Sequence, residues 1–145
     1  MPLEVITPIN EGATATLEFV FKDEDGTAIP VANIATAKMM LTLRGTSTII
    51  NNRVLIDVRT CFNSSGEFSF PLTPADNVIL STAAGLDYEY HLATFQIVTT
   101  GATPITYNES IQLKIRNLQM IRPIYVRPVA VAAVIVTVDP TAVVA

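Results

Sequence analysis

The sequence predicts an all-β fold: a two-sheet antiparallel β-sandwich with one short helix and an extended C-terminal arm. Short segments in which apolar and polar residues alternate recur along most of the chain, with turn-forming residues between them. No long segment with helical periodicity competes with them. The 145 residues suit one domain. We therefore expect an N-terminal segment (1–10), a β-sandwich domain (11–115) and an apolar C-terminal arm for oligomerisation (116–145).

The first half of the domain contains four predicted strands, each with a half-buried pattern of period two. A tight turn at Asp23-Glu24-Asp25-Gly26 should follow the first, and Asn51-Asn52 should form the turn before the third. The expected inward residues of the four strands are Ala15, Leu17, Phe19 and Phe21; Met39, Leu41 and Leu43; Val54, Ile56 and Val58; and Phe68, Phe70 and Leu72.

A short helix is predicted after the fourth strand. Thr73 is a hydroxyl N-cap, Pro74 occupies the first helical position and Asp76 lies in the first turn, while Gly85 should end the helix. Val78, Ile79 and Leu80 would dock on the sheets.

Two further strands should complete the domain. In the first of them, Tyr88, Tyr90 and Leu92 are predicted to point inward. The apolar period then slips by one residue, which predicts a β-bulge near Ala93-Thr94. The inward residues of the last strand should be Ile105, Tyr107, Ile111, Leu113 and Ile115.

Composition favours self-association. Half of the residues are hydrophobic and only 15% are charged, so much apolar surface has to be covered. Residues 1–115 carry six basic and twelve acidic side chains, whereas residues 116–145 carry three basic side chains and one acidic. An acidic body with a mildly basic arm suits docking onto other acidic bodies and disfavours nucleic acid as a partner.

The N-terminus lacks the basic stretch and apolar run of a signal peptide, so synthesis in a host cytoplasm is expected. The apolar run at 129–138 is too short to cross a bilayer as a helix, which needs about 20 residues, so no membrane partner is expected.

Enzymatic function is disfavoured by the residue inventory. His91 is the single histidine, and we expect it to face solvent or an interface. The sequence has no motif for a nucleophilic serine, zinc or phosphate, so we expect no catalytic residue, no metal and no cofactor. Cys61 reads as a small core residue rather than a reactive thiol. We expect the acidic turn at 23–26 to be a solvated hairpin tip, with a calcium ion bound between loops as the alternative. An EF-hand is excluded, because its twelfth position, which requires Glu, would be Ile34.

The C-terminal arm carries the remaining functional information. Arg122-Pro123 and Arg127-Pro128 favour extended backbone, and the valine-rich run at 129–138 between Pro128 and Pro140 would aggregate unless it were paired. We expect this arm to pair with a neighbouring subunit by strand addition. The alternatives are a last strand of the same domain and a disordered tail. The predicted interface residues are Arg122, Tyr125, Arg127, Val129, Val131, Val134, Ile135, Val136 and Val138.

Four segments of the domain carry a resemblance to a known family. EGATATL (11–17), FKDEDGT (21–27), GEFSFPLTPAD (66–76) and DYEY (87–90) together resemble the immunoglobulin-like domains in structural proteins of tailed bacteriophages. The resemblance covers about residues 10 to 115. The segment 48–62, expected to be a long polar-tipped hairpin, and the arm lie outside it.

That resemblance implies a non-enzymatic virion protein. The leading expectation is a head decoration or cement protein on the outer capsid surface, a homo-oligomer with a trimer favoured, bridging copies of the major capsid protein or other virion proteins. One alternative is a tail, neck or baseplate adaptor that anchors a fibre. Another is a receptor- or carbohydrate-binding module, although the chain has no Trp.

Overall fold

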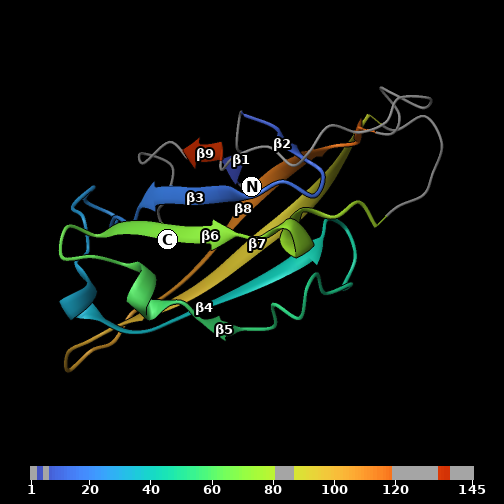
Figure 1. Ribbon diagram of the computed structural model, residues 1–145. Helices are drawn as coiled ribbons and strands as arrows, with labels where there is room; N and C mark the ends of the chain where they lie inside the picture. Colours follow the sequence, from blue (N-terminus) through green and yellow to red (C-terminus); the bar gives the residue numbers. More distant parts are fainter. Residues whose placement is uncertain (1–2, 5–6, 81–86, 119–133, 138–145) are drawn as a thin grey trace.

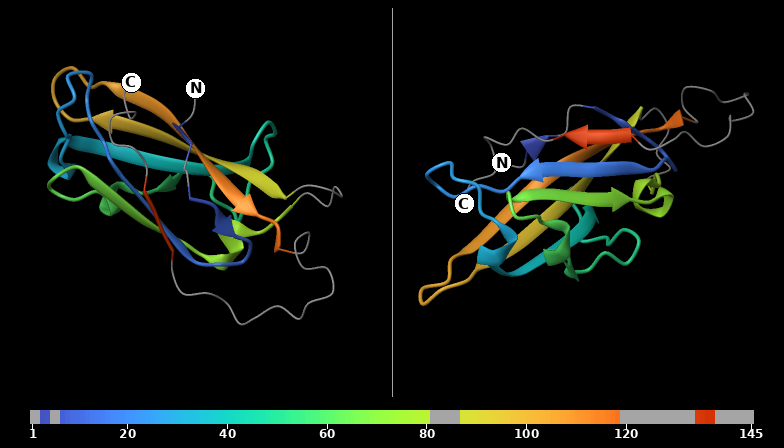
Figure 2. Two further views of the ribbon diagram at one scale, coloured as in Figure 1. Left: turned by 90° about the horizontal axis from the view of Figure 1, so that it is seen from above. Right: turned by 60° about the vertical axis from the view of Figure 1, so that its left-hand side comes forward.

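Two β-sheets lie against each other in the computed structural model, which describes residues 3–4, 7–80, 87–118 and 134–137 (Figures 1 and 2). The larger sheet has the order β1-β8-β7-β4-β5, with β2 also paired to β8, and the smaller has the order β6-β3-β9. The described residues are therefore all-β, apart from three short 3-10 helices. The elements are β1 (Leu3–Glu4), β2 (Ile9–Asn10), β3 (Ala15–Val20), η1 (Val31–Asn33), β4 (Ile34–Leu43), β5 (Ile56–Asp57), η2 (Arg59–Cys61), β6 (Glu67–Leu72), η3 (Pro74–Asn77), β7 (Tyr88–Thr99), β8 (Thr106–Arg116) and β9 (Val134–Thr137).

The core lies between the two sheets and is rich in phenylalanine. In β3 and β6 every second side chain is buried, as the alternating pattern predicts. Phe19 of β3 stacks on Phe68 of β6 with ring centroids 4.6 Å apart, and both meet Phe95 of β7 edge-on at 5.3 Å. These contacts join the smaller sheet to the larger one.

The prediction for β7 is wrong in phase. Glu89, His91 and Ala93 point inward and are buried, whereas Tyr88 and Tyr90 lie on the opposite face and are half-buried. The pairing of β7 with β8 runs without interruption past residues 93 and 94, so the expected bulge is not there. Buried and less buried side chains in fact alternate without a break along most of β7. Two of the inward positions hold Glu89 and His91, which pair with each other.

The segment after Asn51 also differs from its prediction. Only Ile56 and Asp57 form a strand, and Val54, expected inward, is 53% exposed, while Val58 is buried as expected. Asn51 and Asn52 form the predicted turn with left-handed backbone, and Leu55 also has a positive φ of 47°. A bulky residue such as leucine rarely adopts this backbone conformation. The tip (residues 51–55) thus carries the exposed polar Asn51 and Asn52, as predicted, and beside them the exposed apolar Val54 and Leu55.

The predicted helix is a single 3-10 turn, η3. Thr73 is the N-cap, as predicted, and forms a capping box with Asp76, but the backbone becomes extended again at Val78. Val78 and Ile79 pack against the core, as predicted, whereas Leu80, which was also expected to dock, is 40% exposed. Gly85 lies outside the described residues.

Both ends of the chain join the sheets through parallel pairs. β1 and β2 run parallel to β8, and β9 runs parallel to β3, whereas every pair among β3 to β8 is antiparallel. Short parallel pairs are slightly less stable per residue than antiparallel ones. The antiparallel elements therefore form the body to which the terminal strands attach.

Candidate functional site

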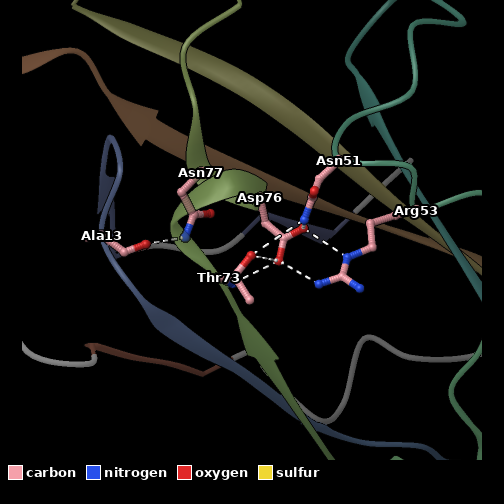
Figure 3. Close-up of polar contacts among 6 residues, drawn as sticks. All are labelled: Ala13, Asn51, Arg53, Thr73, Asp76 and Asn77. Atoms are coloured by element: carbon pink, nitrogen blue, oxygen red, sulfur yellow. Dashed lines mark hydrogen bonds and ion pairs between the residues drawn. The ribbon is translucent and has the colours of Figure 1, made fainter.

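Asp76 is the centre of the densest polar cluster in the described part of the chain (Figure 3). Its side chain is fully buried. One carboxylate oxygen accepts bonds from Asn51 Nδ2 and Arg53 Nε, each at 2.9 Å. The other accepts from Thr73 N at 2.7 Å, Thr73 Oγ1 at 3.0 Å and Arg53 Nη2 at 3.1 Å. Burial alone would raise the pKa of Asp76, but the hydrogen bonds from Arg53, Asn51 and Thr73 outweigh it and hold that pKa below its ordinary value.

This cluster ties the tip (residues 51–55) to η3. Asn51 and Arg53 come from the tip, Thr73 and Asp76 from η3, and the Arg53 guanidinium also lies 5.2 Å from the ring centroid of Phe70. Since five donors surround one carboxylate, Asp76 has no accessible lone pair with which to act as a base or a metal ligand. Its role is to hold a loop.

The neighbouring Asn77 ties η3 to the start of β3. Its side chain is fully buried and donates from Nδ2 to the main-chain carbonyl of Ala13 at 2.8 Å. The main-chain carbonyl of Asn77 accepts a hydrogen bond from Gly12 N at 2.8 Å. Figure 3 shows Asn77 and Asp76 pointing to opposite sides of the same turn. η3 thus joins the tip on one side to β3 on the other.

Glu89 and His91 form a second buried pair. His91 Nε2 lies 2.8 Å from Glu89 Oε1, and the same oxygen accepts from Leu80 N at 2.9 Å. The prediction that His91 faces solvent or an interface is wrong, because the imidazole is fully buried and Glu89 is only 5% exposed. Burial lowers the pKa of His91, with Glu89 opposing the shift, so the imidazole is neutral at physiological pH. The pair is closed to any substrate in this conformation.

Cys61 lines an open hollow of about 420 Å³ beside β3 and β6. The walls include the rings of Phe19, Phe62 and Phe68 and the acidic side chains of Glu18 and Glu67. Cys61 is half-buried against the core rather than fully within it. Burial, and secondarily the charge of Asp57, raises the pKa of its thiol, so the thiolate needed for nucleophilic chemistry is disfavoured.

No group of three or more His, Cys, Asp or Glu side chains among the described residues is arranged to hold a metal ion. Within the same residues, no helix is long and apolar enough to cross a membrane.

Three of the predicted interface residues lie in a described strand. Val134, Ile135 and Val136 belong to β9, whose register places them beside Ala15, Thr16 and Leu17 of the same chain. Over Val134–Thr137 the structure therefore has the arrangement that the sequence left open as the alternative, a last strand of the same domain. The others, Arg122, Tyr125, Arg127, Val129, Val131 and Val138, lie outside the described residues.

Sequence reasoning identified Thr73 as the N-cap and Asp76 as a first-turn carboxylate but missed the bonds that these buried clusters make to distant segments. The ion pair joins residues 23 positions apart, and the bond from Asn51 spans 25. The alternation of β7 was the available signal, since Glu89 and His91 fall in phase with Ala93, Phe95 and Ile97.

No protein-family model matches this sequence, and no curated protein is significantly similar to it. Function has to be inferred from the residues themselves.

Proposed function

We propose that this protein is a non-enzymatic structural component of a bacteriophage particle, a head decoration or cement protein that acts as a homo-oligomer, with a trimer favoured. Its domain would be an immunoglobulin-like sandwich that faces outward from the capsid. The proposal starts from the resemblance of residues 10 to 115 to such domains. By bridging capsid subunits, it would add buried surface across joints that the packaged genome loads.

The assembly role is argued from the edge of β3, which in this structure is paired with β9 of the same chain. β9 extends the small sheet at its edge in the register Ala15↔Val134 to Glu18↔Thr137. A strand added at an edge is held by main-chain hydrogen bonds, which any copy of the same segment can make equally well. The position that β9 occupies can thus be filled by β9 of a neighbouring subunit.

The chain between β8 and β9 is long enough for such an exchange. Residues 119–133 separate the last described residue after β8 from Val134, and an extended segment of that length reaches about 50 Å at most. Exchange of an identical element between protomers is a low-cost route to an oligomer. The assembled protein would then hold each small sheet together with a strand from its neighbour.

A disulfide across the β3–β9 register tests the exchange. Thr16 is paired with Ile135, so Thr16→Cys/Ile135→Cys in a Cys61→Ala background should cross-link on oxidation. Covalent dimers or trimers on a non-reducing gel are expected when the oligomer is oxidised. Thr16→Cys/Thr137→Cys, two residues out of register, is the matched control and should cross-link poorly. Cross-linked monomers alone, from a sample that is oligomeric by light scattering, would contradict the exchange.

Particle composition tests the location. We expect stained gels of purified particles to show hundreds of copies per particle, whereas an adaptor of the tail, neck or baseplate would be present in about a dozen. Adding the protein to stripped heads should delay heat-induced DNA release, and the chain lacking residues 128–145 should not. Unchanged release with the full chain would rule out cementing.

A further inference from the structure

The outer face of the large sheet gathers cations and tyrosines at one end. Neighbouring strands place Tyr90 opposite Lys114 and Tyr88 opposite Arg116, and the main chain of Arg44 pairs with Tyr90 from the other side. These five residues, four from β7 and β8 and Arg44 from the turn directly after β4, form what we call the basic-aromatic face. All of them lie on the side of β7 that faces away from Glu89 and His91.

The cations of this face are held against the tyrosine rings. The Arg44 guanidinium lies 4.3 Å from the ring centroid of Tyr90, and its Nη1 donates to Gln112 Oε1 at 2.9 Å. Lys114 Nζ lies 4.2 Å from the Tyr88 ring centroid, and the Arg116 guanidinium lies 5.9 Å from the same centroid. Cation–π contacts of this kind restrict the side chains before any partner arrives. Arg44 is exposed, whereas Lys114 and Arg116 are half-buried, so Arg44 provides most of the accessible preorganised positive charge of this face.

The same geometry favours carboxylates over nucleic acid as the ligand. Bases bind to aromatic side chains by stacking on a free ring face, but here cations already lie over the rings of Tyr88 and Tyr90. Guanidinium and ammonium groups on an ordered surface match carboxylates through charge-assisted hydrogen bonds. In a chain with a net charge of −4, a further copy of the chain is itself a source of carboxylates.

An acidic turn of suitable charge lies at the other end of the molecule. Asp23 Oδ1 accepts from Asp25 N and Thr27 N, each at 2.9 Å, which makes the turn rigid and leaves Glu24 and Asp25 exposed. This turn follows β3, which ends at the left in Figure 1, whereas β4 and β8 end at the right.

The distance between the two surfaces follows from β8. The Tyr107 hydroxyl, near the start of β8, lies 3.4 Å from Glu24 Oε1, and Arg116 is the last residue of that strand. Nine residue steps at about 3.3 Å each separate them, or about 30 Å. The turn and the basic-aromatic face therefore cannot meet within one chain.

We propose that the acidic turn of one copy docks on the basic-aromatic face of the next, so that subunits associate head to tail. This rests on the proposed assembly function and specifies one of its contacts. The turn carries three acidic side chains, those of Asp23, Glu24 and Asp25, and the face carries three basic ones, those of Arg44, Lys114 and Arg116. A contact between two different surfaces of the same protein is heterologous and generates a closed ring when the rotation permits, including the favoured trimer.

Reciprocal charge reversal tests this contact. Arg44 and Asp25 are both exposed, so Arg44→Glu and Asp25→Lys should fold normally. Each alone should weaken self-association in sedimentation equilibrium about tenfold, because like charges then face each other. An equimolar mixture of the two variants, and the double variant Arg44→Glu/Asp25→Lys, should regain most of the loss. The association of the wild-type chain should also weaken with added salt.

The matched control is Lys38→Glu, which reverses an exposed charge of the same sign elsewhere on β4 and should leave association unchanged. Circular dichroism verifies the fold of every variant. Equal losses for Lys38→Glu and Arg44→Glu, or no regain in the double variant, would overturn the head-to-tail contact. So would binding of a labelled single-stranded oligonucleotide that Arg44→Glu abolishes while self-association stays intact.

Failure of this contact can be distinguished from failure of the proposed function. If the β3–β9 cross-link joins subunits but the charge reversals have no effect, the protein assembles without this contact. If the wild-type chain stays monomeric at all concentrations and is missing from particles, the assembly function itself is wrong.

Discussion

Replacing Arg53 with methionine should destabilise the protein mainly by leaving the Asp76 carboxylate buried without its counter-ion. Arg53 supplies two of the five hydrogen bonds on that carboxylate, at 2.9 and 3.1 Å, and its own side chain is 23% exposed. Removing one partner of a buried ion pair costs about 3–5 kcal/mol. Because water can partly replace a side chain that is 23% exposed, we expect the lower end, about 3 kcal/mol in the free energy of unfolding.

Urea denaturation followed by circular dichroism measures this loss directly. For a domain of this size, about 3 kcal/mol corresponds to a fall in Tm of about 10 °C. Methionine keeps much of the stem that lies against Phe70, so the change removes charge more than volume. Arg53→Lys keeps the charge but loses the two-pronged bond and should lose about 1–2 kcal/mol. Lys38→Met, at an exposed site, should cost less than about 0.5 kcal/mol.

The pH dependence identifies the cause. The lowered pKa of Asp76 means that its ionised form stabilises the fold fully above the unfolded value of about 3.9, and that this contribution is lost as pH falls through the lower folded value. Without Arg53, burial of the carboxyl is less opposed and its pKa rises. As pH falls, the Asp76 carboxyl therefore becomes protonated in the variant before it does in the wild type, which removes the cost of the buried unpaired charge. The difference in the free energy of unfolding between wild type and variant should then narrow from about pH 7 to about pH 4. A gap that stays constant over this range, or is below about 1 kcal/mol at neutral pH, would refute the reasoning.

Two further perturbations address the backbone and the buried histidine. Gly66→Ala should lower the free energy of unfolding by about 2–4 kcal/mol, because a Cβ would lie 2.8 Å from the Ile29 carbonyl oxygen at a φ of +77°. Gly45→Ala, with a φ of +78° and open space around it, should lower it by only about 1 kcal/mol in the same urea titration. The lowered pKa of His91 means that the unfolded chain binds the extra proton below about pH 6.5, so this stability is present above that pH and is lost as pH falls. His91→Gln, whose amide can still donate to Glu89, should reduce the fall in the free energy of unfolding between about pH 7 and about pH 5. An identical fall in the wild type and the variant would show that His91 is not its source.

Most strands could be predicted from the sequence because a strand with one buried face has a period of two. Leu17 and Phe19 in β3, and Phe68 and Phe70 in β6, are buried as that pattern requires. In β7 the same alternation places His91 in phase with the buried Phe95 and Ile97, but hydropathy does not register the hydrogen bond that makes a histidine acceptable inside.

The polar clusters depend on contacts between distant segments. Asp76 could be recognised as a carboxylate in the first turn of a helix, but its bonds to Arg53 require the fold to bring the tip and η3 together. The basic-aromatic face is equally non-local, because Arg44 and Gln112 are 68 residues apart. The tail composition predicted that the valine-rich segment needs a pairing partner, but not that β3 would provide it over Val134–Thr137.

The parallel attachment of both chain ends has a consequence for how the molecule comes apart. The hairpin of β7 and β8, together with β4, is one continuous antiparallel ladder, whereas β1, β2 and β9 add only two to four residues each at its margins or on the second layer. Such short additions open at a free energy well below that of global unfolding. Amide protons of β1, β2 and β9 can therefore exchange with solvent while those of the ladder formed by β4, β7 and β8 stay protected.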